Sequence, residues 1–140
     1  MSEKLAYKEF RKGICHKNDR IDRVENLMVL GIPDVNVCSD GFESWIELKT
    51  SVEPKRKTTP LMGSNHKLSI DQRNWMMRQV KAGGRCYILI STDKRWLLIN
   101  GNYADFVNEQ TVEQLIKVAE WNTVKSGKID WDDLRKVLTK

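Results

Sequence analysis

A short β-hairpin around Asp40-Gly41 is the feature that most constrains this chain. An Asp-Gly pair between two alternating segments is a strong signal for a two-residue hairpin loop. With this pair as the loop, Ser39 faces Phe42, and each further pair of facing residues has numbers that add up to 81. The register sets Asp34 directly opposite Glu47, with the two Cβ atoms roughly 4.5–5.5 Å apart on one face.

Two carboxylates and a lysine share that face of the predicted hairpin. Lys49 lies two residues beyond Glu47 and points the same way, because side chains alternate along a strand. The opposite face carries apolar side chains that can be buried: Val35, Val37, Ile46 and Leu48. Facing carboxylates repel each other and destabilise a sheet, and a hard divalent cation such as Mg²⁺ or Mn²⁺ removes that repulsion. With an ammonium group nearby to position or activate a water, the pattern predicts hydrolysis of a phosphate ester.

The order Pro33-Asp34, a turn, and Glu47-Leu48-Lys49 resembles the PD-(D/E)xK nuclease superfamily. Within it, the chain resembles the small stand-alone VRR-type nucleases of phages and bacteria, which are similar in turn to Holliday-junction resolvases. The resemblance spans roughly residues 20–91 and includes Arg23-Val24-Glu25-Asn26 and Gln72-Arg73-Asn74-Trp75. At the place of the name-giving Val-Arg-Arg, this chain has Ile88-Leu89-Ile90-Ser91.

The resemblance implies a Mg²⁺-dependent DNA endonuclease, with Mn²⁺ able to substitute, that acts as a homodimer on branched DNA such as four-way junctions. The implied catalytic set is Asp34, Glu47, Lys49, Gln72 and Glu25, and the implied metal ligands are Asp34, Glu47, Glu25 and the backbone carbonyl of Leu48. Lys49 would hold and activate the attacking water. Glu9, on an expected N-terminal helix, competes with Glu25 for the role of additional acid.

Several of these residues also have simpler interpretations. Gln72 stands three residues after Ser69, where a glutamine often returns a hydrogen bond to the backbone at the start of a helix; the two roles can coexist if the side chain switches. The expected DNA-binding residues are Lys55, Arg56, Lys57, Lys67 and Arg73, although a run of charge is more often solvated surface. Two alternative functions follow from the simpler interpretations: a non-catalytic basic DNA-binding or accessory module, and a protein-interaction domain that uses the tryptophans.

Composition limits the class of protein. The 140 residues suit one domain, and a net charge of +5 permits nucleic-acid binding without requiring it. No apolar run approaches the roughly 18–20 residues of a membrane span, and no membrane partner is expected. Cys15, Cys38 and Cys86 form no CxxC pair, so reduced thiols and a cytoplasmic location in a bacterium or a phage-infected host are expected, and zinc is not.

The expected fold is α/β, with a restriction-endonuclease-like mixed β-sheet flanked by helices in a single domain of residues 1–140. The nuclease-like core covers about residues 20–100, and the C-terminal helices of 108–140 either pack on this core or form a dimer interface. Helices are expected at 2–13, 69–82, 111–125 and 130–138, a hairpin at 33–50, and strands at 85–91 and 95–99; residues 21–29 fit a strand or a helix end. The long connection after Thr50 contains two prolines, and connections of this length are usually functional or mobile.

Overall fold

The structure is a computed structural model that describes residues 2–25, 28–63 and 66–140. Within these residues, six strands form one sheet in chain order: β1 (Arg20–Arg23), β2 (Val35–Ser39), β3 (Phe42–Thr50), β4 (Cys86–Ser91), β5 (Arg95–Asn100) and β6 (Trp121–Val124). The helices are α1 (Glu3–Ile14), α2 (Ile70–Lys81), α3 (Val112–Val118) and α4 (Trp131–Leu138), with short 3₁₀ turns η1 (Gly101–Tyr103) and η2 (Val107–Glu109).

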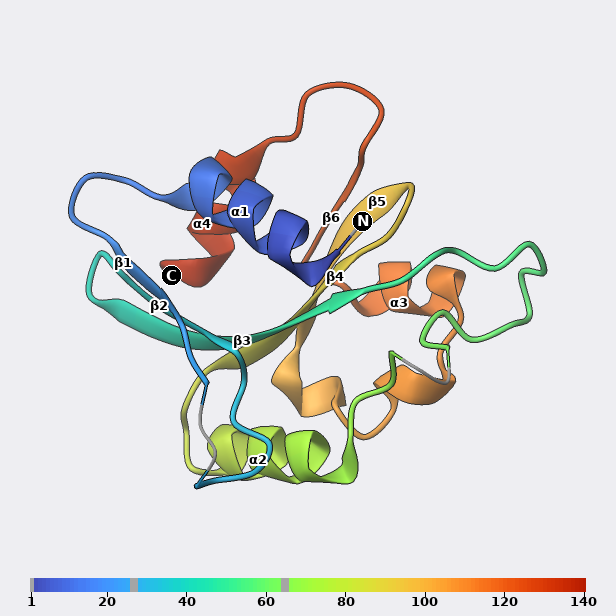
Figure 1. The fold of residues 1–140 in the computed structure, drawn as a ribbon, viewed down its shortest axis with the longest axis horizontal. Helices are drawn as coiled ribbons and strands as arrows, with labels where there is room; N and C mark the ends of the chain where they lie inside the picture. The colour runs from blue at the N-terminus through green and yellow to red at the C-terminus, as the bar shows by residue number, and fades with distance from the viewer. Residues whose placement is uncertain (1, 26–27, 64–65) are drawn as a thin grey trace.

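Helices cover both faces of the sheet. α1 and α4 pack side by side on one face, while α2 and α3 lie on the other (Figure 1). Two apolar cores result: one holds Phe10, Ile46 and Leu134, and the other holds Met76 and Ile88. Because β3 and β4 are buried on both faces of the sheet, their side chains pack against helices on both sides.

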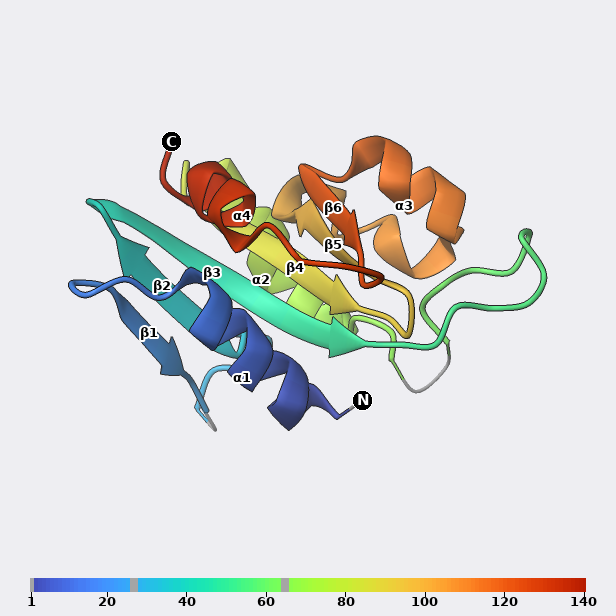
Figure 2. The ribbon, with the colours of Figure 1, turned by 90° about the horizontal axis from the view of Figure 1, so that it is seen from above.

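The only parallel pair among the described strands is β3 with β4, and α2 lies in the crossover that joins them. Figure 2 shows this central pair running between the helix layers. An α-helical crossover between parallel strands, with antiparallel strands on both flanks, gives a mixed sheet. The expected restriction-endonuclease-like α/β fold in one domain is confirmed.

The predicted hairpin has the expected register. Asp40 and Gly41 both adopt positive φ, at 50° and 83°, as a type I′ turn requires. Ser39 pairs with Phe42 and Val35 with Ile46. The same register, extended by one residue, places Asp34 opposite Glu47.

One predicted helix is wrong in its second half. The expected helix at 111–125 begins as predicted, with Thr111 and Gln114 forming a reciprocal capping box, but α3 ends at Val118. Residues 121–124 instead form β6, which pairs antiparallel with β5. Trp121 buries against the core by this pairing, and tertiary packing of an aromatic and a β-branched residue outweighs the helical periodicity. The stretch at 21–29 begins as β1 and ends in exposed bends, with residues 26 and 27 outside the described part.

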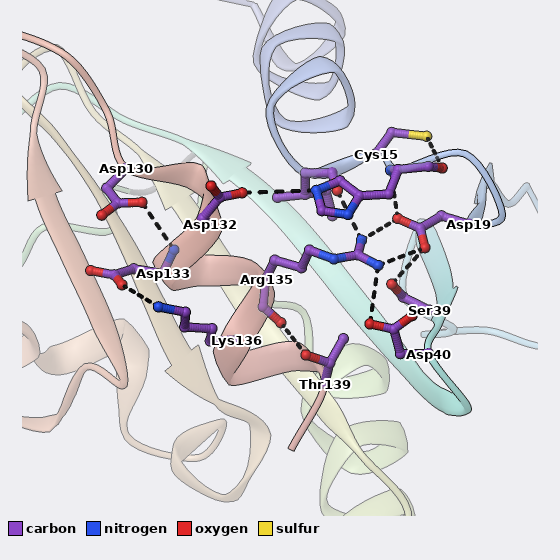
Figure 3. A network of polar contacts seen from close by, with 12 residues as sticks. Cys15, Asp19, Ser39, Asp40, Asp130, Asp132, Asp133, Arg135, Lys136 and Thr139 are labelled. Carbon is purple, nitrogen blue, oxygen red and sulfur yellow. Dashed lines mark hydrogen bonds and ion pairs between the residues drawn. The ribbon is translucent and has the colours of Figure 1, made fainter.

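The C-terminal helix is tied to the hairpin by a network centred on Arg135 (Figure 3). Its guanidinium donates to both carboxylate oxygens of Asp19, to the carbonyl of Ile14 at 3.0 Å and to Asp40 at 3.3 Å. Asp19 also accepts a hydrogen bond from Ser39 at 2.7 Å. The apolar residues of α4 lie in the core, so this face packs within the same chain.

Among the described residues, no helix has the length and apolar character needed to cross a membrane.

Candidate active site

Glu47 and Lys49 lie near the carboxyl end of β3, on the face that α2 covers. Both side chains are largely buried: the side chain of Glu47 is 6% exposed and that of Lys49 is 12% exposed. The Lys49 Nζ lies 3.6 Å from Glu47 Oε2. A buried carboxylate and a buried ammonium of this kind are rare unless they are paired or hold a ligand.

Asp34 stands directly before β2 and faces the same place. Its Oδ1 accepts a hydrogen bond from the backbone N–H of Leu48 at 2.9 Å, which fixes the carboxylate against β3 between Glu47 and Lys49. Its Oδ2 lies 3.8 Å from the guanidinium of Arg23. The strand pairing of β1 continues past Arg23, because the N–H of Val24 donates to the carbonyl of Asp34 at 2.7 Å. Both neighbouring strands therefore hold Asp34 in place.

The two carboxylates oppose each other electrostatically. Burial and, after it, the negative charge of Asp34 raise the pKa of Glu47, Lys49 opposes the rise, and the net result is a pKa of about 8. Burial also raises the pKa of Asp34, against the lowering effects of the Leu48 N–H and Arg23. The site thus places two acids where their charged forms are unfavourable without a further cation.

Gln72 caps α2 and contacts the site at the same time. Its Oε1 accepts from the backbone N–H of Ser69 at 2.9 Å, and the Ser69 hydroxyl accepts from the Gln72 N–H, which completes the capping box of α2. Its Nε2 donates to Glu47 Oε2 at 3.1 Å. No switch of the side chain is needed, because the two ends of one amide serve the two partners. The contact is with Glu47 rather than with Lys49.

Two tryptophans are in contact on this face of the sheet. Trp45, two residues before Glu47 and on the same face, makes an edge-to-face contact with Trp75 of α2, with ring centroids 5.7 Å apart. This contact joins the helix that carries Gln72 to the strand that carries Glu47.

The predicted additional acid lies elsewhere. Glu25 is exposed, two residues past the end of β1, and no hydrogen bond or ion pair of the described residues joins it to Asp34 or Glu47. Glu9 instead interacts with Lys125. Burial lowers the pKa of this lysine, and the negative charge of Glu9 raises it. Glu3, in the first turn of α1, instead raises the pKa of both Asp34 and Glu47.

Sequence reasoning missed Glu3, although one signal was available: an acid directly after the Ser2 cap marks the start of the N-terminal helix. Only the packing of α1 on the sheet brings that helix start to the carboxyl end of β3 (Figure 2).

The donor set fits a hard divalent cation. The described residues hold no cluster of three or more histidine, cysteine, aspartate or glutamate side chains. Asp34 and Glu47 would therefore hold an ion together with backbone oxygen, such as the carbonyl of Leu48, and with water. Mg²⁺ commonly binds in this way, through one or two carboxylates while it keeps several waters.

The predicted DNA-binding residues lie in two places. Lys55, Arg56 and Lys57 are exposed on the connection that follows β3. Lys67 is exposed before α2, and Arg73 is half-buried on α2 with its Nε buried and without a hydrogen-bond partner among the described residues. Arg85 serves the fold, because it donates to the carbonyls of Val137 and Lys140 at the end of α4.

Comparison with known proteins adds a fold relationship. No protein-family model matches the chain, and no curated protein sequence matches it. The fold resembles that of Hjc, a Holliday junction resolvase from the archaeal hyperthermophile Archaeoglobus fulgidus. The two chains are 18% identical, with a TM-score of 0.54, over 82% of this chain and 88% of Hjc. At this identity the likeness to Hjc concerns the fold alone.

Proposed function

We propose that this chain is a divalent-metal-dependent endonuclease that hydrolyses phosphodiester bonds in branched DNA. The observation that carries the proposal is the buried pair of Asp34 and Glu47 with Lys49 3.6 Å from Glu47. Two buried acids whose charged forms are unfavourable would only destabilise a hairpin with a purely structural role. The resolvase-like fold and the exposed cations after β3 support the same conclusion.

The proposed mechanism assigns a task to each side chain. Asp34 and Glu47 would hold Mg²⁺, or Mn²⁺ in its place, and Gln72 orients Glu47 through its hydrogen bond. The bound ion would polarise the scissile phosphate and lower the pKa of a water. Lys49 orients the attacking water and offsets charge that develops in the transition state. The water oxygen forms a bond to phosphorus and gives up one proton to solvent. The bond from phosphorus to one bridging oxygen breaks, and that oxygen takes up one proton from solvent, so that the net reaction adds one water across the P–O bond.

A cleavage assay on a panel of DNA structures tests this proposal. With Mg²⁺ present, we expect cutting of four-way junctions or flaps in preference to linear duplex. Asp34→Asn and Lys49→Ala should each lose roughly 10²-fold or more in rate. Lys136→Ala, which changes a lysine that is 79% exposed on α4, is the matched control and should cut normally.

Each outcome has a definite meaning. Native rates in Asp34→Asn and Lys49→Ala would exclude the site. A chain that binds DNA but shows no saturable Mg²⁺ or Mn²⁺ site by calorimetry would favour the non-catalytic DNA-binding module. Equal cutting of linear duplex would remove the preference for branched DNA.

Two further properties belong to the same proposal. The enzyme acts as a homodimer, since a twofold assembly suits paired cuts on opposed strands. It works in the cytoplasm, in keeping with the free thiols of Cys15, Cys38 and Cys86.

A further inference from the structure

A cleft lies beside the connection that follows β3, away from Asp34 and Glu47. It has a volume of about 400 Å³ and is bounded by this connection, the β4–β5 turn and α3. Its rim carries Lys55, Arg56, Lys57 and Lys94, and its floor includes Val112 and Ile116. We call it the basic cleft, and we call residues 54–60 the basic arm.

The two ends of the basic arm are held in place. At one end, Glu53 Oε2 accepts hydrogen bonds from Thr92 at 2.6 Å and from Arg95 at 2.9 Å, and its side chain is 7% exposed. The backbone N–H of Glu53 donates to Asp93 at 2.9 Å. At the other end, the N–H of Leu61 donates to the carbonyl of Gln110 at 3.0 Å. The arm therefore presents its cations from a fixed base.

The charge of the cleft is unbalanced. Five basic and two acidic side chains line it, and Glu53 is already paired with Arg95. Among the ion pairs of the described residues, none involves Lys55, Arg56, Lys57 or Lys94. Unpaired cations held around a concave surface favour an anionic ligand.

The cleft lies within reach of a strand bound at the candidate active site. Six positions separate Lys49 from Lys55, a span of at most roughly 20–22 Å for an extended chain. Successive nucleotides of one duplex strand rise about 3.4 Å along the axis, so about six nucleotides cover the distance. Both places lie at the carboxyl end of β3, from which the arm leaves the sheet (Figure 1).

The floor of the cleft is an apolar part of α3. Val112 and Ile116 are half-buried, and the fully buried Leu115 lies between them on α3. A paired duplex offers phosphates to the rim but keeps its bases stacked. An unpaired base can leave the stack at low cost and rest on an apolar surface.

We propose that the basic cleft binds an unpaired nucleotide of the DNA substrate, with its phosphate at the lysines and Arg56 of the rim and its base against Val112 and Ile116. The inference rests on the proposed function and makes it more specific. The substrates favoured are branched DNAs with a single-stranded segment about six nucleotides or fewer from the cut.

Binding measurements in EDTA test the cleft separately from cleavage. The probes are a labelled blunt duplex and the same duplex with a single-stranded thymidine tail, followed by fluorescence anisotropy. We expect the native chain to bind the tailed duplex at least about fivefold more tightly. Ile116→Ser should abolish this preference without changing affinity for the blunt duplex, and Ile116→Leu should keep it. Val124→Ser, which changes a valine that is 51% exposed on β6, is the apolar control and should also keep it.

The rim is tested by the dependence on salt. Lys55→Gln with Lys57→Gln should lower the slope of log affinity against log salt by about one for each lost phosphate contact. Lys8→Gln, on the exposed side of α1, should leave the slope unchanged. Thermal melting of every variant separates loss of fold from loss of binding.

The proposal is overturned if Ile116→Ser discriminates the two probes as the native chain does, or if the double lysine variant keeps the native salt slope. Cleavage in Mg²⁺ is scored apart from binding. If the chain prefers the tailed probe but cuts no DNA, the proposed cleft function stands and the proposed nuclease activity is excluded. If the chain cuts DNA without this preference, the nuclease activity stands and the cleft function is excluded.

Discussion

Glu47 is subject to opposing electrostatic interactions, and the proposed chemistry depends on them. It is almost fully buried, faces Asp34, and yet sits beside Lys49 and Gln72, which favour its charged form. The lysine and the amide orient the carboxylate but do not cancel the repulsion of its neighbour. Residues whose pKa is strongly shifted in this way are common where a protein binds a ligand or performs a reaction.

The first prediction concerns the pH dependence of stability without metal. Because the pKa of Glu47 is raised to about 8 from 4.5, the folded chain binds the proton more tightly than the unfolded chain does. This stabilisation is complete below about 4.5 and is lost as the pH rises through about 8. Thermal melting in EDTA should therefore show a decline of at least about 1 kcal/mol across this window, or roughly 3–6 °C.

Two comparisons identify the cause of that decline. Glu47→Gln should flatten the pH dependence, since the amide does not titrate. Mg²⁺ should raise the melting temperature of the native chain most at the upper end of the window, because it binds the charged form. A decline that runs parallel in the native chain and in Glu47→Gln would contradict the assignment.

The second prediction separates the two acids of α1. Glu3 raises the pKa of both site carboxylates, whereas Glu9 interacts with Lys125. Glu3→Gln should lower Mg²⁺ affinity, because it removes a negative charge that acts on both site carboxylates. Glu9→Gln serves as the matched control on the same helix. Calorimetric Mg²⁺ titration measures both variants, and equal behaviour of the two would remove Glu3 from the site.

At the scale of elements, α4 is joined to the start of β1 and to the hairpin tip by one buried ion pair. The Arg135 side chain is 10% exposed and that of Asp19 is 3% exposed. The hydrogen bonds from Arg135 hold the pKa of Asp19 well below its usual range. This network fixes three segments that are distant in sequence (Figure 3).

The third prediction follows from that network. Arg135→Met should destabilise the fold by roughly 3–5 kcal/mol at neutral pH, because it leaves the buried Asp19 carboxylate without its main partner. The penalty should begin to shrink as the pH falls below the ordinary pKa of an aspartate, near 3.8, because the contribution of the native pair declines from there down to the depressed pKa of Asp19. Urea denaturation at several pH values measures both effects.

Lys136→Ala is the control for Arg135→Met, since its exposed neighbour pair should contribute less than about 0.5 kcal/mol. The double variant Arg135→Met, Asp19→Asn should recover part of the loss by removing the unpaired charge. A penalty for Arg135→Met that stays constant from neutral to acidic pH would show that packing, not charge, explains the effect.

At the scale of the whole molecule, three large apolar side chains are exposed on α2 or on segments near it. Leu30 is 68% exposed, Ile70 64% and Phe106 60%. Leu30 lines one hollow with Asp71 and Met77 of α2 and with Asp105, the neighbour of Phe106. Exposed apolar groups that lie together often mark a protein interface, so this surface is where we expect the proposed homodimer to form.

The fourth prediction tests that surface. Leu30→Ser with Phe106→Ser should shift the chain from dimer to monomer, while Val124→Ser on β6 should leave the dimer intact. Light scattering after size-exclusion chromatography measures the mass. A native chain that is already monomeric at all concentrations would contradict the homodimer, and a double variant that stays dimeric would contradict the choice of surface.

Local rules were sufficient for the hairpin and for much of the site. The Asp40-Gly41 turn and the alternation of side chains placed Asp34, Glu47 and Lys49 on one face, because both depend only on neighbouring residues. The capping box of Ser69 and Gln72 is equally local, and the start of α2 follows from it. These features need no knowledge of what packs against them.

Packing between distant segments decided the rest. Trp121 belongs to a strand because β5 offers an edge to pair with, and periodicity alone favoured a helix. Glu3 raises the pKa of both site carboxylates because α1 packs across the sheet, whereas Glu25 is exposed just after β1. The sequence alone determined which side chains stand side by side along a strand. Only the tertiary structure decided which remote charges share a poorly solvated space, since such contacts depend on how whole layers pack and not on spacing along the chain.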